Sequence, residues 1–187
     1  KKLLYNYIYD VNCTDWLIPA RCNGTSGGGK ANCVTFVMYF LSRFTSADPR
    51  KFLLSDRTGH GGSIVSNMTG TDVEANGKTF RVTESYDTSL FEFGGFEPRP
   101  FAVFSTEENA SAICDGHKCG HTGVVLGINK EADEIYIGQV GYRSSLTAPW
   151  ILQVVYSLSE YSSGKYWYAY TDKVVNQNAI NEFLNSN

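Results

Sequence analysis

The chain has 187 residues, with 16 basic and 19 acidic side chains that give a formal net charge of −3. Its 12 Tyr, 11 Phe and 3 Trp exclude a disordered chain, because so many aromatic side chains need a packed core. The basic residues are outnumbered and scattered, which argues against a nucleic-acid partner, and no apolar stretch reaches the ~20 residues of a membrane span. We therefore expect one globular domain over residues 1–187.

The five cysteines fall into two close pairs and one single residue. Cys13 and Cys22 bracket a short loop, and Cys114 and Cys119 bracket a turn, so both pairs suit local disulfides. Such disulfides would place the protein in an oxidising compartment and leave Cys33 as the free thiol. The alternative is five reduced cysteines in a cytosolic protein, since pairing does not follow from sequence alone.

Residues 1–32 are irregular and rich in turn formers. They lack the sustained apolar run and the small-residue cleavage site of a signal peptide, so we expect the sequence to begin after such a peptide or inside a larger protein. From Cys33 to about Thr45 the residues are apolar nearly all round. This pattern predicts a buried helix that ends before Asp48-Pro49.

The middle of the chain, residues 55–99, carries Gly, Asn, Thr and Ser with short apolar runs, which predicts long loops and one strand at 80–83. Strand signals follow at 101–104, 121–128, 135–140, 150–158 and 165–170, with a short amphipathic helix at 174–184. Consecutive strands with short connections predict an antiparallel meander. A helix followed by a sheet, without βαβ alternation or an internal repeat, predicts the α+β class.

Cys33 is the first candidate for chemistry. It follows a Gly-rich stretch and Asn32, a good helix N-cap, so its sulfur is expected at a helix amino terminus. Unpaired N–H groups and the helix dipole stabilise a thiolate there, and a neighbouring imidazolium lowers the thiol pKa further. The alternative is a buried cysteine that packs as a small hydrophobic residue.

His121 is the second candidate, because it opens a predicted strand whose other residues are apolar or small. A polar ring at a strand end can face a cleft while its neighbours anchor the sheet. Its alternatives are a surface histidine or a metal ligand. A zinc site at Cys114, His117, Cys119 and His121 places four ligands within eight residues, which strains a tetrahedral geometry.

Three segments together resemble the CHAP family of cysteine, histidine-dependent amidohydrolases and peptidases, which is close to the NlpC/P60 group. They are Asn32-Cys33-Val34-Thr35-Phe36-Val37, Pro98-Arg99-Pro100-Phe101-Ala102-Val103-Phe104 and Gly120-His121-Thr122-Gly123-Val124-Val125. The resemblance spans roughly residues 32–142. It implies a papain-like α+β fold, in which a buried helix carrying the nucleophile packs on an antiparallel sheet.

The resemblance also implies a site and a substrate. Cys33 would be the nucleophile and His121 its general base, without a cofactor, and the reaction would cleave an amide bond in bacterial peptidoglycan. The family places Glu, Asp or Asn on the next strand to orient the histidine, and the matching polar residue here is Gln139. A Gln carbonyl can accept from the imidazole N–H but adds no negative charge. Relative to the family, residues 105–120 are an apparent insertion beside the site.

The surroundings of this site leave alternatives open. Tyr142 and Trp150 are candidates to line a groove for a glycan or stem peptide, or else they pack in the core. The bond is either the sugar-to-peptide amide or one within the peptide, and the protein is expected to be secreted or associated with the cell wall. The alternative function is a catalytically inactive CHAP-like module that binds cell wall or a partner protein.

Overall fold

The computed structural model describes residues 33–48, 61–82, 87–108, 113–114, 117–118, 120–141 and 150–185. Within these ranges the fold is α+β, with short helices and antiparallel sheets. In chain order the elements are α3 (Cys33–Phe44), η3 (Gly61–Ser63), α4 (Ile64–Thr69), β1 (Val73–Ala75), β2 (Lys78–Phe80), β3 (Glu92–Phe93), β4 (Val103–Thr106), β5 (Ile113–Cys114), β6 (His117–Lys118), β7 (His121–Asn129), β8 (Glu134–Gly141), β9 (Trp150–Ser157), α5 (Leu158–Tyr161), β10 (Tyr166–Tyr170) and α6 (Gln177–Asn185).

A six-stranded sheet in the order β3-β10-β4-β7-β8-β9 forms the centre of the fold. Every neighbouring pair is antiparallel, and the predicted meander is confirmed for β7, β8 and β9. It is wrong for β10, which lies between β3 and β4 instead of following β9. The five residues of β10 are all buried, and a strand buried along its whole length belongs inside a sheet rather than at its edge.

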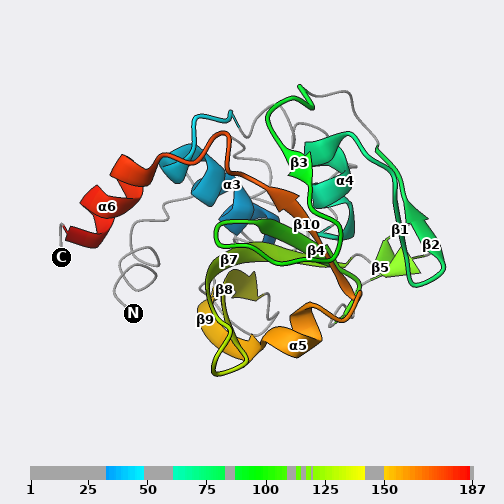
Figure 1. Ribbon diagram of the computed structural model, residues 1–187. Helices are drawn as coiled ribbons and strands as arrows, with labels where there is room; N and C mark the ends of the chain where they lie inside the picture. Colours follow the sequence, from blue (N-terminus) through cyan, green and yellow to red (C-terminus); the bar gives the residue numbers. More distant parts are fainter. Residues whose placement is uncertain are drawn as a thin grey trace.

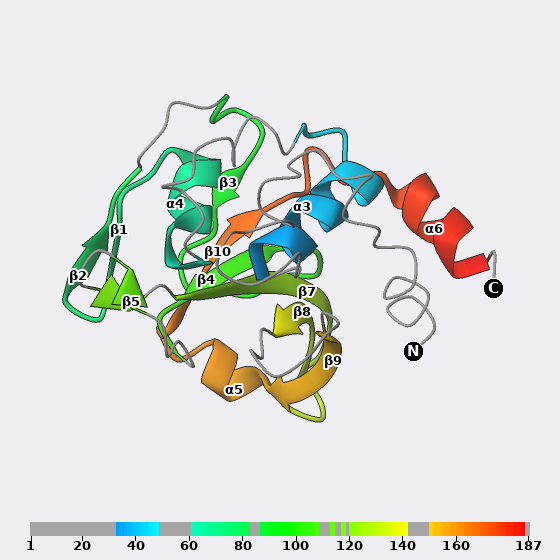
Figure 2. The ribbon, with the colours of Figure 1, turned by 180° about the vertical axis from the view of Figure 1, so that it is seen from behind.

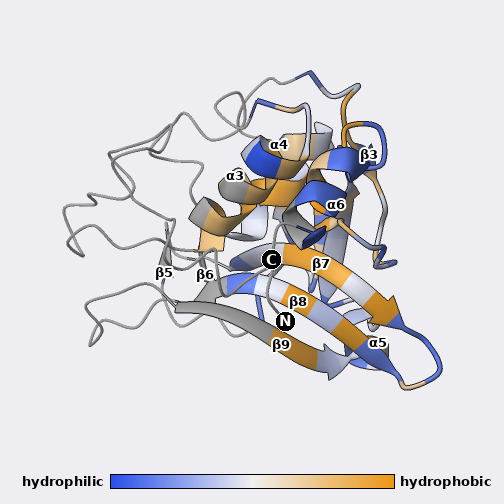
Figure 3. Ribbon diagram, turned by 90° about the vertical axis from the view of Figure 1, so that its left-hand side faces the viewer, coloured by the Kyte–Doolittle hydropathy of each residue, from blue (hydrophilic) through white to orange (hydrophobic). Residues whose placement is uncertain are grey.

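The two faces of this sheet carry different helices. Successive residues point to opposite faces, so Val124 packs in the cluster beneath α3 and α4, whereas Val125 packs in the cluster that includes Tyr161 of α5. Figures 1 and 2 show α3 and α4 on one side of the sheet and α5 on the other. Figure 3 shows apolar residues along α3 and along β7, the strand it packs against. The site described below therefore rests on a helix that is held to the sheet by burial.

The region expected to consist of long loops contains regular structure. The short helix α4 follows η3, and β1 and β2 form a hairpin. All six residues of α4 are buried, including Ser66 and Asn67, so no polar face marks it as a helix. The expected strand at 80–83 is instead β2, which ends at Phe80.

Several expected boundaries also change. Strand β4 continues through Thr106, so the connection expected at 105–120 begins after that residue, and part of it forms the β5–β6 hairpin. Strand β9 ends at Ser157, whose Oγ accepts from Glu160 N at 3.3 Å and so caps α5. The last helix begins at Gln177 rather than at Val174.

The segment before α6 closes the carboxyl end of α3. Ser46 N donates to Val174 O at 2.9 Å, Asn176 N donates to Phe44 O at 2.8 Å, and Thr45 and Val175 form an antiparallel bridge. The bond to Phe44 O uses a carbonyl group that the carboxyl end of a helix leaves without an intrahelical partner. Among the described residues, no helix has the length and apolar character needed to cross a bilayer.

The structure leaves the expected disulfides untested. Cys13, Cys22 and Cys119 lie outside the described residues, and Cys114 is described only through its backbone in β5. Cys33 carries a free thiol, as expected.

Candidate active site

Cys33 is the first residue of α3, so its half-buried thiol lies at the amino end of that helix. The predicted buried helix is confirmed within one residue of its expected end. Val34, Val37 and Leu41 are each 0% exposed and anchor the helix in the core. The sulfur is thereby fixed at the end of an element that packs on β7 and β8.

His121 is the first residue of β7 and pairs with Thr106 of β4. The next residue, Thr122, is fully buried, and its Oγ1 donates to Phe104 O at 2.6 Å, which fixes the start of the strand. The His121 ring lies 6.0 Å from the ring of Phe104, between their centroids. The imidazole therefore packs against Phe104 of β4, the strand that pairs with the start of β7.

Gln139 of β8 contacts His121 directly. Its Oε1 lies 2.6 Å from His121 Nε2, and its side chain is buried. An imidazole has two ring nitrogens, so this contact leaves Nδ1 for the sulfur of Cys33, which is hydrogen-bonded to the His121 side chain. Three residues from α3, β7 and β8 thus form a continuous hydrogen-bonded chain.

Two backbone donors also reach the sulfur. Burial opposes ionisation of Cys33, but the hydrogen bond and charge of His121 lower its thiol pKa below the ordinary value. The backbone N–H groups of Thr122 and Val34 lower it further. The site therefore favours a thiolate, which is the nucleophilic form of cysteine.

The pKa of His121 moves in the opposite direction. Burial alone would lower it, but the hydrogen bond to Cys33, the charge of that thiolate and the hydrogen bond to Gln139 raise it above its ordinary value. A raised imidazole pKa and a lowered thiol pKa together favour an ion pair between Cys33 and His121. Such a pair holds both a nucleophile and a proton donor before any substrate arrives.

The amide of Gln139 has a second partner that sequence reasoning missed. Its Nε2 donates to Tyr156 Oη on β9 at 3.1 Å. Tyr156 pairs with Ile135 along the strands, whereas Gln139 pairs with Leu152, so the contact runs diagonally across the sheet. A side-chain contact of this kind follows from neither local pattern nor strand register.

The backbone of η3 lies directly against the start of β7. A Cβ on Gly61 would lie 2.6 Å from the backbone carbon and Cα of His121, and 2.8 Å from Thr122 N. Gly120 has φ +74°, and a Cβ there would lie 2.5 Å from Gly62 N. Only glycine permits this approach, and no local sequence pattern predicts it.

Ser105 connects the same segment to β4. Its buried Oγ donates to Gly61 O at 2.6 Å and accepts from Val65 N at 3.1 Å. The position of η3 against His121 is therefore set by buried hydrogen bonds as well as by glycine.

The remaining predicted site residues are not described in full. Tyr142 lies outside the described residues, and Trp150 is described only through its backbone at the start of β9. Of the four residues in the zinc interpretation, His121 is the one whose side chain is described, and its ring faces Cys33 and Gln139. Within the described ranges, no three His, Cys, Asp or Glu side chains gather closely enough to hold a metal ion.

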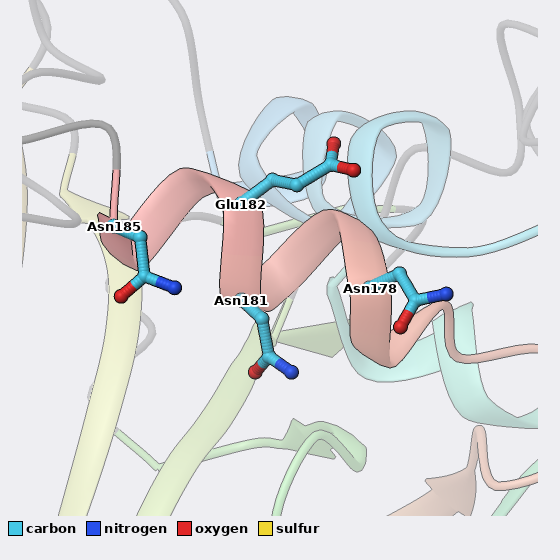
Figure 4. A pocket seen from close by; sticks show the side chains of 4 residues that line it. All are labelled: Asn178, Asn181, Glu182 and Asn185. Atoms are coloured by element: carbon cyan, nitrogen blue, oxygen red, sulfur yellow. The ribbon is translucent and has the colours of Figure 1, made fainter.

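A separate hollow lies along α6 and is unrelated to this chemistry. It is lined by four residues of that helix, Asn178, Asn181, Glu182 and Asn185 (Figure 4). Its lining holds no nucleophile or general base paired with another titratable group.

This site is therefore described from its own geometry. No family model, no curated protein and no solved structure matches this chain.

Proposed function

We propose that the protein is a thiol hydrolase that cleaves an amide bond in bacterial peptidoglycan. The observation that carries the proposal is the chain of hydrogen bonds from Cys33 through His121 to Gln139 at the amino end of a buried helix. A cysteine, a histidine and an orienting amide in this order form the nucleophile, base and orienting group of papain-like hydrolases. We extend the proposal to the fold, in which α3 on an antiparallel sheet takes the papain-like arrangement.

The reaction begins at the ion pair. In this pair His121 already holds the proton of the Cys33 thiol, and the thiolate sulfur attacks the carbonyl carbon of the scissile amide to form a C–S bond. The backbone N–H of Cys33, in the first turn of α3, is the donor that we assign to the oxyanion. When the C–N bond breaks, the imidazolium gives its proton to the leaving amine.

Water completes the cycle. His121 removes a proton from the water, the new C–O bond replaces the C–S bond, and the sulfur leaves as a thiolate beside the imidazolium, which restores the ion pair. No step needs an external oxidant, reductant or cofactor. Gln139 keeps the ring oriented throughout by accepting from Nε2–H.

The substrate class and location rest on the resemblance to the CHAP family. Peptidoglycan contains both a sugar-to-peptide amide and amides within its stem peptides, so the proposal covers an N-acetylmuramoyl-L-alanine amidase and a peptide endopeptidase. It places the protein outside the cytoplasm, secreted or associated with the cell wall.

The test is loss of turbidity in a suspension of purified Gram-positive cell walls. We expect the native protein to clear the walls, and Cys33→Ala and His121→Ala each to reduce the rate by more than about 10³-fold. Cys33→Ser is the matched control, because it replaces the thiol by a hydroxyl of similar size. It should give the native far-UV circular dichroism and no clearing. Mass spectrometry of the released fragments identifies the bond.

Two outcomes would contradict the proposal. Clearing that persists in Cys33→Ala would exclude the thiol mechanism. Binding to walls without clearing, together with slow alkylation of Cys33, would favour the inactive binding module instead.

A further inference from the structure

The third member of the site is an amide, and an amide has two unlike ends. Gln139 presents Oε1 to His121 Nε2 and Nε2 to Tyr156 Oη. A carboxylate at this position would accept through either oxygen and would need no particular orientation. The orientation of the amide therefore decides whether Gln139 supports or opposes the charge on the imidazole.

The opposite orientation would disable the ion pair. If the amide rotated by half a turn, its NH₂ group would face His121 Nε2, and a donor there requires that ring nitrogen to be unprotonated. The imidazolium carries N–H on both nitrogens, so it would lose its acceptor and face a second donor. The neutral pair of thiol and imidazole would then be favoured over the ion pair.

We propose that Tyr156 is a positioning residue that selects the productive orientation of Gln139. Its hydroxyl oxygen lies 3.1 Å from Gln139 Nε2 and accepts from that group, which leaves Oε1 for His121. Tyr156 acts through Gln139 and takes no part in bond making. The inference rests on the proposed thiol chemistry, and it does not depend on which amide is the substrate.

The tyrosine is well placed to hold this orientation. Its ring stacks on Tyr161 with centroids 5.2 Å apart and an interplanar angle of 26°, and Tyr161 stacks in turn on Tyr166 at 3.9 Å. The position of the hydroxyl is thus fixed by the aromatic cluster on the α5 side of the sheet. Phenylalanine would keep the stacking and lose only the hydroxyl, so Tyr156→Phe is expected to fold.

The test measures the rate at which iodoacetamide alkylates Cys33 as a function of pH, read from the Cys33 peptide by mass spectrometry. In Tyr156→Phe we expect the apparent thiol pKa to rise and alkylation near pH 7 to slow by about fivefold, which is the equivalent of one ordinary hydrogen bond. Tyr136→Phe is the matched control. Its hydroxyl donates to Glu134 Oε2 at 2.8 Å, away from the site, so its profile should equal that of the native protein.

A second test, made in the Gln139→Glu variant, distinguishes a positioning role of Tyr156 from a packing role. Gln139→Glu replaces the amide by a carboxylate that needs no orientation, so adding Tyr156→Phe to it should change the alkylation rate by less than about twofold. Equal losses in both backgrounds, or a native pH profile in Tyr156→Phe, would overturn the inference. Because alkylation uses no cell wall, failure of the wall-clearing assay would leave this result intact, and failure here would leave the proposed hydrolase intact.

Discussion

At the scale of single residues, the site depends on the two nitrogens of one histidine. His121 Nε2 is engaged by Gln139, and the ring is hydrogen-bonded to Cys33 on its other side. Burial disfavours charge on both Cys33 and His121, so each charge is stabilised chiefly by the other, with smaller contributions from two backbone N–H groups and from Gln139. Removing either partner leaves an isolated group that reverts to its neutral form.

The two pKa shifts predict how the site depends on pH. The lowered thiol pKa means that the thiolate persists as pH falls below the ordinary cysteine value of about 8.5. The raised imidazole pKa means that the imidazolium persists as pH rises above the ordinary value of about 6.5. We therefore expect a bell-shaped profile of kcat/KM, with the acid limb set by Cys33 and the basic limb by His121. Alkylation of Cys33 that begins only near the ordinary cysteine pKa would contradict this.

Gln139 should matter less than the other two residues. Gln139→Ala removes one hydrogen bond to a charged ring, which contributes about 1.5–3 kcal/mol, so we expect wall clearing to slow by about 10- to 160-fold. Cys33→Ala, measured beside it, should lose far more. An unchanged rate in Gln139→Ala would remove this residue from the site.

At the scale of elements, the approach of η3 to β7 provides a test of alignment. Gly61→Ala would push a methyl group into the backbone of His121, and a misplacement of about 1 Å at a reacting group costs about 10²-fold in rate. We expect a loss of this size both in the rate at which Cys33 is alkylated and in the rate of wall clearing.

Gly127→Ala is the control for this substitution, because it lies on the same strand and its added Cβ would make only ordinary contact, 3.7 Å from Tyr136 Cδ2. It should keep native rates, and its thermal midpoint should be equal to or above that of the native protein. Native rates in Gly61→Ala would show that η3 does not align the site.

The predictability of the elements follows from how local their signals are. α3 and the strands β7, β8 and β9 lie within one or two residues of their expected bounds, because each carries its own periodicity. The helix α4 was missed, since Ser66 and Asn67 are polar and yet fully buried in it. The Ser66 hydroxyl is satisfied by a tertiary contact, because Ser66 Oγ donates to Phe80 O at 2.8 Å, and no local pattern contains that contact.

The same distinction applies to the site. Cys33 and His121 stand at the ends of elements that the sequence predicts, and Gln139 is the polar residue on the following strand. Tyr156 and Gly61 come from elements that lie beside the site only after the chain has folded. Their roles depend on tertiary placement, which periodicity and spacing do not encode.

At the scale of the whole molecule, the core that stabilises the fold is separable from the site. Leu41 is 0% exposed in the cluster beneath α3 and α4 and lies about 12 Å along the helix from Cys33. Leu41→Ala should therefore lower the free energy of unfolding by about 2–5 kcal/mol, measured by urea denaturation. At 25 °C, Cys33 in the folded fraction of this variant should be alkylated at the native rate. A reduced rate in fully folded protein would show that core packing and thiol reactivity are coupled.

The central place of β10 also has a consequence for synthesis. Translation produces Cys33, His121 and Gln139 before it produces residues 166–170, yet that strand must insert between β3 and β4. Until it does, the cluster beneath α3 and α4 lacks Trp167, and the segment that closes the end of α3 is also missing. A nascent chain therefore contains all three groups before the sheet that holds them is complete. We expect Cys33 to become reactive only when β10 has inserted, so the thiol of a chain that ends before β10 should be alkylated like an ordinary cysteine.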